Sequence, residues 1–223
     1  MCRLTVAPRL TAVLFDLDGT LLDSFDLISE SFKQACRQVL NRDLSHEEVM
    51  ARWGWPLRFR FEAVDSSRVD ALIDAYQACY RASHDRMIAL FPGVREMLDA
   101  LKTHRIRMGI VTSKRRPTTR LAIERLHLSP YFGAVVTEQD VPAPKPAPDP
   151  VFAALRELGA AAEDALMVGD AAFDMQAAHS AGVRGAAALW GTREQDALLA
   201  TGPDFTLAAP ADVVALVDKR PPE

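Results

Sequence analysis

The chain has 223 residues, of which 49% are apolar and 25% charged, and its formal net charge is −4. This composition excludes extensive disorder, and the acidic balance argues against a broad surface for nucleic-acid phosphates. We therefore expect a globular protein whose partner is a small molecule and not a nucleic acid.

The amino-terminal segment predicts no export signal. Arg3 and Arg9 precede an apolar run at 12–15, but Asp16 interrupts that run long before it could serve as a signal sequence. No other stretch has the apolar length needed to span a bilayer. The cysteines are odd in number and form no CxxC pair, which fits a reducing compartment: Cys2, Cys36 and Cys79. We expect a soluble cytoplasmic protein, either a monomer or a homodimer, without a membrane partner.

Residues 12–15, Ala-Val-Leu-Phe, predict a short strand buried on both faces, and Asp-Leu-Asp-Gly-Thr follows at 16–20. Residues two apart in extended backbone point the same way, so Asp16 and Asp18 can face one site. Gly19 permits a tight turn. A plain Asp-Gly turn explains this fragment alone about equally well. A calcium-binding EF-hand loop is excluded, because the glycine and glutamate that it requires are missing.

The next part of the chain shows only helical patterns, at 27–40, 45–53 and 69–87. Ser45 and Glu48 form a capping-box pattern at the second of these, and Gly54 can end it. We expect a small all-helical domain at 23–87, inserted into a larger domain formed by 1–22 and 88–223. Its aromatic residues at 53, 55 and 59 are expected to be core residues more often than ligand contacts.

After Pro92 and Gly93, helices and strands alternate, which is typical of parallel βαβ units. Helices are expected at 94–102, 117–126, 150–158 and 173–181, and strands at 105–111, 134–136, 165–168 and 185–189. The predicted fold class is α/β, a three-layer core with a mostly parallel sheet that includes the first strand. The proline-rich stretch at 142–150 could be a linker between domains. The strands beyond it would then lack a sheet, so we expect a rigid loop that holds Lys145.

Several polar residues follow predicted strands, at the sheet edge where open α/β folds bind ligands. Thr112 and Ser113 follow one strand, and Asp170 follows another, with Asp174 four residues later. Each has an ordinary explanation: a threonine at a strand end, a solvated Lys145 or an N-cap Asp170. Their combination with the two carboxylates after the first strand is much less easily explained by chance.

These segments can be matched to a known family. The sequences DLDGT at 16–20 and GDAAFD at 169–174, with Thr112 and Lys145 between them, resemble the four motifs of haloacid dehalogenase-like phosphatases. They occur in the family's order. The prolines around Lys145 and the Pro-Gly at 92–93 look most like the branch that contains phosphoglycolate phosphatase and β-phosphoglucomutase. The resemblance implies a Rossmann-like core with a helical cap at 23–87.

The resemblance also implies roles for the carboxylates. Mg²⁺ would be held by Asp16, the backbone carbonyl of Asp18, and Asp170. Asp16 would be the nucleophile that forms an aspartyl-phosphate, and Asp18 would donate and remove protons. Gly19 would support the turn that follows Asp18.

The remaining residues would bind or position the substrate. Thr112, with Ser113, would bind phosphoryl oxygens, and Lys145 would neutralise their charge, oriented by Asp174. Asp174 could instead orient metal-bound water. Arg58 resembles a residue of the cap's substrate loop.

Two positions depart from the family pattern, and one feature goes beyond it. Ala171 stands where a small polar residue is frequent, and Ser113 where asparagine is common. The basic run Lys114, Arg115 and Arg116 is either a solvated turn or a feature that attracts a second anionic group on the substrate.

We therefore predict a Mg²⁺-dependent phosphatase that hydrolyses a small phosphorylated metabolite, such as a phosphoglycolate-like ester. The alternatives are a phosphosugar mutase, a pyrophosphatase and a non-catalytic ligand-binding relative. Dehalogenation is disfavoured, because phosphate-directed members of the family use the second aspartate, here Asp18.

Overall fold

A computed structural model describes residues 10–218. Cys2, Arg3 and Arg9, and with them the expectation about an export signal, lie outside the described residues. The regular elements follow one another along the chain in this order: β1 (Ala12–Phe15), β2 (Leu22–Asp23), α1 (Phe25–Leu40), α2 (His46–Met50), α3 (Leu57–Val64), α4 (Val69–Met87), β3 (Ala89–Leu90), α5 (Val94–Thr103), β4 (Arg107–Thr112), α6 (Arg116–Arg125), β5 (Phe132–Thr137), α7 (Asp149–Leu158), a 3₁₀ turn (Ala162–Asp164), β6 (Ala165–Gly169), α8 (Ala172–Ser180), β7 (Arg184–Ala188), α9 (Gln195–Leu199), β8 (Phe205–Leu207) and α10 (Ala211–Asp218).

Six parallel strands form the main sheet, in the order β5-β4-β1-β6-β7-β8. The first strand therefore lies in the middle, between β4 and β6, and the prediction that it pairs with later strands is confirmed. The strands beyond the proline-rich stretch belong to the same sheet, so that stretch does not separate two domains. The α/β fold class is confirmed.

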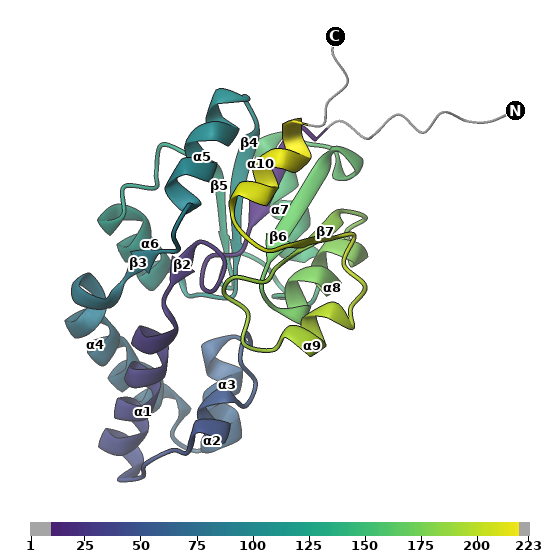
Figure 1. Ribbon diagram of the computed structural model, residues 1–223. Helices are drawn as coiled ribbons and strands as arrows, with labels where there is room; N and C mark the ends of the chain where they lie inside the picture. Colours follow the sequence, from purple (N-terminus) through teal and green to yellow (C-terminus); the bar gives the residue numbers. More distant parts are fainter. Residues whose placement is uncertain (1–9, 219–223) are drawn as a thin grey trace, which may run out of the picture.

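The continuous apolar run of β1 reflects burial on both faces of the sheet. Val13 and Phe15 belong to the core cluster shared with α5 and α10, whereas Ala12 and Leu14 belong to the cluster shared with α7 and α8. All four side chains are fully buried. Burying a Val, Leu or Phe side chain contributes roughly 1.5–3 kcal/mol, so both helix layers stabilise this strand. Figure 1 shows the resulting three layers.

The helices α1 to α4 lie between β2 and β3, which pair with each other in antiparallel fashion at the base of the insertion. Figure 1 shows these helices gathered at one end of the molecule. Phe32 of α1 stacks on Phe61 of α3 with ring centroids 4.4 Å apart. The inserted helical region is confirmed, while its definition as a separate domain at 23–87 stays a prediction.

Several elements differ from the sequence-based expectation. The capping box of Ser45 and Glu48 is present, but α2 ends at Met50, and α3 was not anticipated. The inward face of α3 includes Arg60, which interrupts the apolar pattern that would have predicted a helix. β8 was missed because a three-residue strand is too short to show alternation. The helix that follows it, α10, was not predicted either. Within residues 10–218, no helix has the length and apolarity required to cross a membrane.

Candidate active site

Asp16 stands at the carboxyl end of β1, where its backbone N–H donates to the carbonyl of Val168 at 2.9 Å. The chain turns at Gly19, which has a φ of +85°. A Cβ at that glycine would lie 2.2 Å from Oδ2 of Asp170. The glycine is therefore required twice, for the left-handed backbone and for the space that the neighbouring carboxylate occupies.

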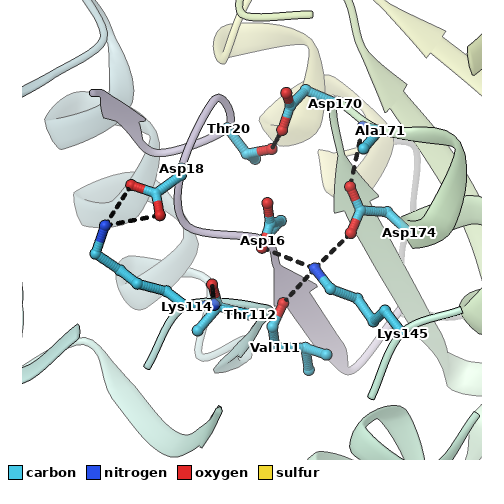
Figure 2. A network of polar contacts seen from close by, with 10 residues as sticks. All are labelled: Asp16, Asp18, Thr20, Val111, Thr112, Lys114, Lys145, Asp170, Ala171 and Asp174. Atoms are coloured by element: carbon cyan, nitrogen blue, oxygen red, sulfur yellow. Dashed lines mark hydrogen bonds and ion pairs between the residues drawn. The ribbon is translucent and has the colours of Figure 1, made fainter. Parts of the chain in front are cut away.

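Lys145 joins two of the carboxylates (Figure 2). Its Nζ lies 2.8 Å from Oδ1 of Asp16 and 2.6 Å from Oδ1 of Asp174, and it also donates to the carbonyl of Val111 at 3.0 Å. Three acceptors match the three N–H donors of an ammonium group. The structure thus places Asp174 in contact with Lys145. Its role, whether it orients this lysine or metal-bound water, stays a prediction.

Burial affects the pKa values of Lys145 and Asp16 differently. Burial disfavours the charged form of Lys145, but Asp16 and Asp174 outweigh burial and raise its pKa above the usual range. Burial raises the pKa of Asp16 to about 7, and repulsion from Asp174 adds to this effect. Lys145 lowers the pKa, but it does not outweigh burial. A buried site with this excess of carboxylates gains stability from a further cation.

Asp170 follows β6 and completes a cluster of three acidic side chains. Its Oδ1 accepts a hydrogen bond from Thr20 Oγ1 at 2.9 Å. Burial raises its pKa well above the ordinary value, and Asp16 and Asp174 raise it further. Oxygen atoms of Asp16, Asp170 and Asp174 all lie within 4.8 Å of one another. Carboxylate oxygens suit Mg²⁺, so the donor set fits a divalent metal site.

The cluster has one member that the sequence analysis did not name as a ligand. Both oxygens of Asp174 are already engaged, one by Lys145 and the other by the backbone N–H of Ala171 at 3.0 Å. Within residues 10–218, Oδ2 of Asp16 and Oδ2 of Asp170 accept no hydrogen bond. Asp16 and Asp170 are therefore the better candidates for direct metal ligands.

The end of β4 contributes hydroxyl groups. Thr112 is almost completely buried, and its Oγ1 accepts the backbone N–H of Lys114 at 3.1 Å. The Oγ of Ser113 is buried and has no hydrogen-bond partner among the described residues. An unpartnered buried hydroxyl is unfavourable unless a ligand satisfies it, so both residues are suited to bind anionic oxygens.

Asp18 lies on the opposite side of the site from Lys145 (Figure 2). Its Oδ1 accepts a hydrogen bond from Ser24 Oγ at 2.6 Å. Lys114 Nζ lies 3.0 and 2.8 Å from its two oxygens. Lys114 is only 9% exposed, so the prediction of a solvated basic turn is wrong for this residue. Sequence analysis singled out the run of three basic residues, but it gave no sign that one of them faces inward.

These side chains border a cavity of about 90 Å³. This volume is far below the roughly 300–1,000 Å³ of pockets for drug-sized ligands, which favours a small substrate. The cavity is lined by most of the predicted site residues, namely Asp16, Asp18, Thr112, Ser113, Lys145, Asp170 and Asp174. Helical-region residues line its other side, among them Trp53, Trp55, Arg60 and Tyr76.

Arg58 is the predicted site residue that the structure does not bring to this cavity. It is exposed and pairs with Asp70 at 2.5 Å, and it borders a neighbouring hollow. Arg60, two residues later and so about 200° around the same helix, lines the cavity instead. Its Nε is buried without a hydrogen-bond partner among residues 10–218, and burial lowers its pKa to about 10.

The loop at 53–55 packs against the residues after Asp170. Trp55 contacts Phe173 edge-on with ring centroids 5.1 Å apart. A Cβ on Gly54 would be 3.4 Å from the Cβ of Ala171, so a small residue at 171 leaves room for this loop. The expectation that the aromatic residues of this segment are core residues is wrong for Trp55 and Phe59, which are 38% and 40% exposed.

Asp16 stands at the end of a central parallel strand, next to the buried Lys145 and two further aspartates, and this cluster of carboxylates is consistent with a divalent-metal site. Residues 13–188 match the family model for haloacid dehalogenase-like hydrolases, and the chain belongs to this family. The family resemblance noted in the sequence is thereby confirmed.

Two proteins with similar sequences are named as pyrophosphatases. The chain is 36% identical over 209 residues to the pyrophosphatase PpaX of Anoxybacillus flavithermus, covering 94% of this chain and 97% of the relative. It is 34% identical to PpaX of Oceanobacillus iheyensis, covering 92% and 95%.

Solved structures agree on the fold. A haloacid dehalogenase-like hydrolase from Streptococcus pneumoniae has a TM-score of 0.82 at 28% identity, covering 92% of this chain and 97% of the other. The crystal structure of a Lactobacillus plantarum protein assigned as a phosphoglycolate phosphatase has a TM-score of 0.84 at 25% identity, covering 93% of this chain and 99% of the other.

Proposed function

We propose that this protein hydrolyses inorganic pyrophosphate to two phosphate ions in the presence of Mg²⁺. The observation that carries the substrate assignment is the 36% identity to the pyrophosphatase PpaX over nearly the full length of both chains. The sequence analysis gave a phosphoglycolate-like ester as the main substrate and pyrophosphate as an alternative. The comparison favours the alternative.

The arrangement of the site supports the chemistry. An oxygen of Asp16 forms a bond to phosphorus while the bond from phosphorus to the bridging oxygen breaks, and one phosphate leaves. Lys145, at 2.8 Å, positions the Asp16 carboxylate. Thr112 and the unpartnered hydroxyl of Ser113 are suited to bind the transferred phosphoryl group.

In the second step, water attacks the phosphorus of the aspartyl-phosphate. The bond between phosphorus and the Asp16 oxygen breaks, which releases the second phosphate and restores the carboxylate. Asp18, which lines the cavity beside Asp16, takes a proton from this water.

Asp16 and Asp170, together with the backbone carbonyl of Asp18, would hold Mg²⁺, which neutralises phosphoryl charge when bound. The buried cluster of carboxylates supports such a site, because like charges at this separation are costly without a counterion. The space that Gly19 leaves for the Asp170 carboxylate is a second sign that this group must reach the cavity.

Phosphate release can be measured with Mg²⁺ and three substrates: pyrophosphate, phosphoglycolate and glucose 1-phosphate. We expect the highest kcat/KM for pyrophosphate, complete loss in excess chelator, and no activity for Asp16→Asn. A preference for phosphoglycolate would restore the main sequence-based prediction, and formation of glucose 6-phosphate would indicate a mutase. Failure on every substrate, with Mg²⁺ binding retained, would indicate a non-catalytic relative.

A further inference from the structure

The cavity contains two buried lysines, and the proposed reaction uses only one of them. Lys145 contacts Asp16 and Asp174, on the side of the nucleophile. Lys114 projects from the segment after β4 and contacts Asp18 on the other side (Figure 2). The two cations therefore serve different parts of the site.

Lys114 is held between the core and the inserted helices. Its ammonium group lies 2.8 Å from an oxygen of Asp18 and 4.6 Å from the centroid of the Tyr80 ring, which belongs to α4. Burial disfavours its charge, but Asp18 and the neighbouring tyrosines outweigh burial and raise its pKa. The ammonium group of Lys114 therefore lines the cavity on the side of Asp18.

The acceptors of the two lysines differ in number. Among the described residues, Lys145 contacts two carboxylates and a carbonyl, whereas the hydrogen bonds of Lys114 go to the two oxygens of a single carboxylate. A second anion can therefore approach Lys114 more easily than Lys145.

The in-line geometry of phosphoryl transfer indicates which anion would approach Lys114. In phosphoryl transfer the leaving oxygen departs roughly in line with, and opposite to, the attacking oxygen. The family resemblance implies that Asp18 gives a proton to that leaving oxygen, and Lys114 is in direct contact with Asp18. Lys114 therefore stands where a leaving group would emerge.

We propose that Lys114 binds the anionic part of the leaving group and thereby selects substrates whose leaving group carries its own negative charge. This inference rests on the proposed function, since it makes Asp16 the nucleophile and a phosphate ion the leaving group. A phosphate leaving group, or an alkoxide leaving group that carries a carboxylate, gains the ion pair, whereas a leaving group without a second ionised group does not.

The neighbouring basic residues differ from Lys114 in exposure and in their partners, although Arg115 also lines the cavity. Arg115 lies 3.8 Å from Glu138, and its side chain is partly exposed. Arg116 is exposed and pairs with Asp140. Only Lys114 of the three is buried, which makes Arg116→Gln a matched control for the loss of one nearby positive charge.

The test compares kcat/KM of Lys114→Met on pyrophosphate, phosphoglycolate and 4-nitrophenyl phosphate. This ratio excludes the later hydrolysis of the aspartyl-phosphate, in which Asp18 also takes part. Because a charged hydrogen bond contributes about 1.5–3 kcal/mol, we expect losses on the order of 10- to 100-fold for the first two substrates. The aryl phosphate, whose leaving group has no second ionised group, should lose less than about threefold by the same principle.

Further measurements separate binding from folding. Lys114→Arg should recover part of the selectivity, and Arg116→Gln should leave it unchanged. Lys114→Met should also weaken inhibition by methylenediphosphonate much more than inhibition by inorganic phosphate. Thermal unfolding identifies variants that do not fold. If Lys114→Met does not fold, Lys114→Arg carries the test on the same substrates and inhibitors.

Equal losses on all three substrates would overturn the proposal, because they would mean that Lys114 only supports Asp18. If wild-type enzyme does not hydrolyse pyrophosphate, the proposed function fails. The comparison of phosphoglycolate with the aryl phosphate then still decides the role of Lys114.

Discussion

Replacing the nucleophile should stabilise the metal-free protein at alkaline pH. The pKa of Asp16 is raised from 3.8 to about 7, chiefly by burial. The folded state therefore binds this proton more tightly than the unfolded chain does. The stability that the proton contributes is present below pH 4 or so and is lost as the pH rises to about 7. A difference of roughly 3 pKa units corresponds to at most about 4 kcal/mol.

The variant Asp16→Asn removes this ionisation. In chelator at pH 8 it should unfold at a higher temperature than wild type. The upper limit of the shift is roughly 8–16 °C, since 1 kcal/mol shifts the Tm of a chain this size by about 2–4 °C. At pH 5 the gap should narrow, because Asp16 of the wild type is then mostly protonated. Mg²⁺ should raise the Tm of wild type more than that of the variant.

Thermal unfolding followed by circular dichroism, with and without Mg²⁺, measures these shifts. The exposed Asp70→Asn provides a control, since a surface pair contributes about 0–1 kcal/mol. If Asp16→Asn lowers the Tm at pH 8 without metal, the pair with Lys145 outweighs burial, and the argument from the raised pKa is refuted.

Three other substitutions test separate parts of the site. Asp18→Asn should still phosphorylate Asp16 from an aryl phosphate but hydrolyse the adduct slowly, giving a burst of phenol in quenched flow; a burst from Asp16→Asn would reverse the two roles. Gly19→Ala should destabilise the fold by about 1–3 kcal/mol and weaken Mg²⁺ binding in calorimetry, because its Cβ would clash with Asp170; unchanged Mg²⁺ affinity would contradict the crowding. Arg58→Ala should alter kcat/KM for pyrophosphate by less than about threefold, since it breaks only an exposed ion pair; a large loss would show that Arg58 reaches the substrate.

The sequence predicted the parts of this molecule that follow from strand burial and from residue order. The apolar run of β1 indicated a central strand, and the aspartates, threonine and lysine that follow strands indicated one sheet edge. Parallel strands bring their carboxyl ends together, so Asp16, Thr112 and Asp170 could be assigned to the same edge before any geometry was known.

The inserted helices were harder to read from sequence. Arg58 and Arg60 differ by two positions, and only the orientation of α3 determines which of them lines the cavity. The inward position of Lys114 depends on its contacts with Asp18 and Tyr80, which lie far away in the sequence. Such long-range contacts leave no local pattern in the sequence. For α3, in contrast, the spacing of Leu57, Arg60 and Phe61 could have indicated the inner face of the helix.

The central claim is that Asp16 carries the phosphoryl group during turnover of pyrophosphate. Wild-type enzyme can be mixed with Mg²⁺ and pyrophosphate, quenched in acid within the first turnover, digested and examined by mass spectrometry. The account predicts one added phosphoryl group on the peptide that contains Asp16, absent in chelator and absent from Asp16→Asn. An adduct on Asp18, or rapid hydrolysis of pyrophosphate by Asp16→Asn, would contradict it.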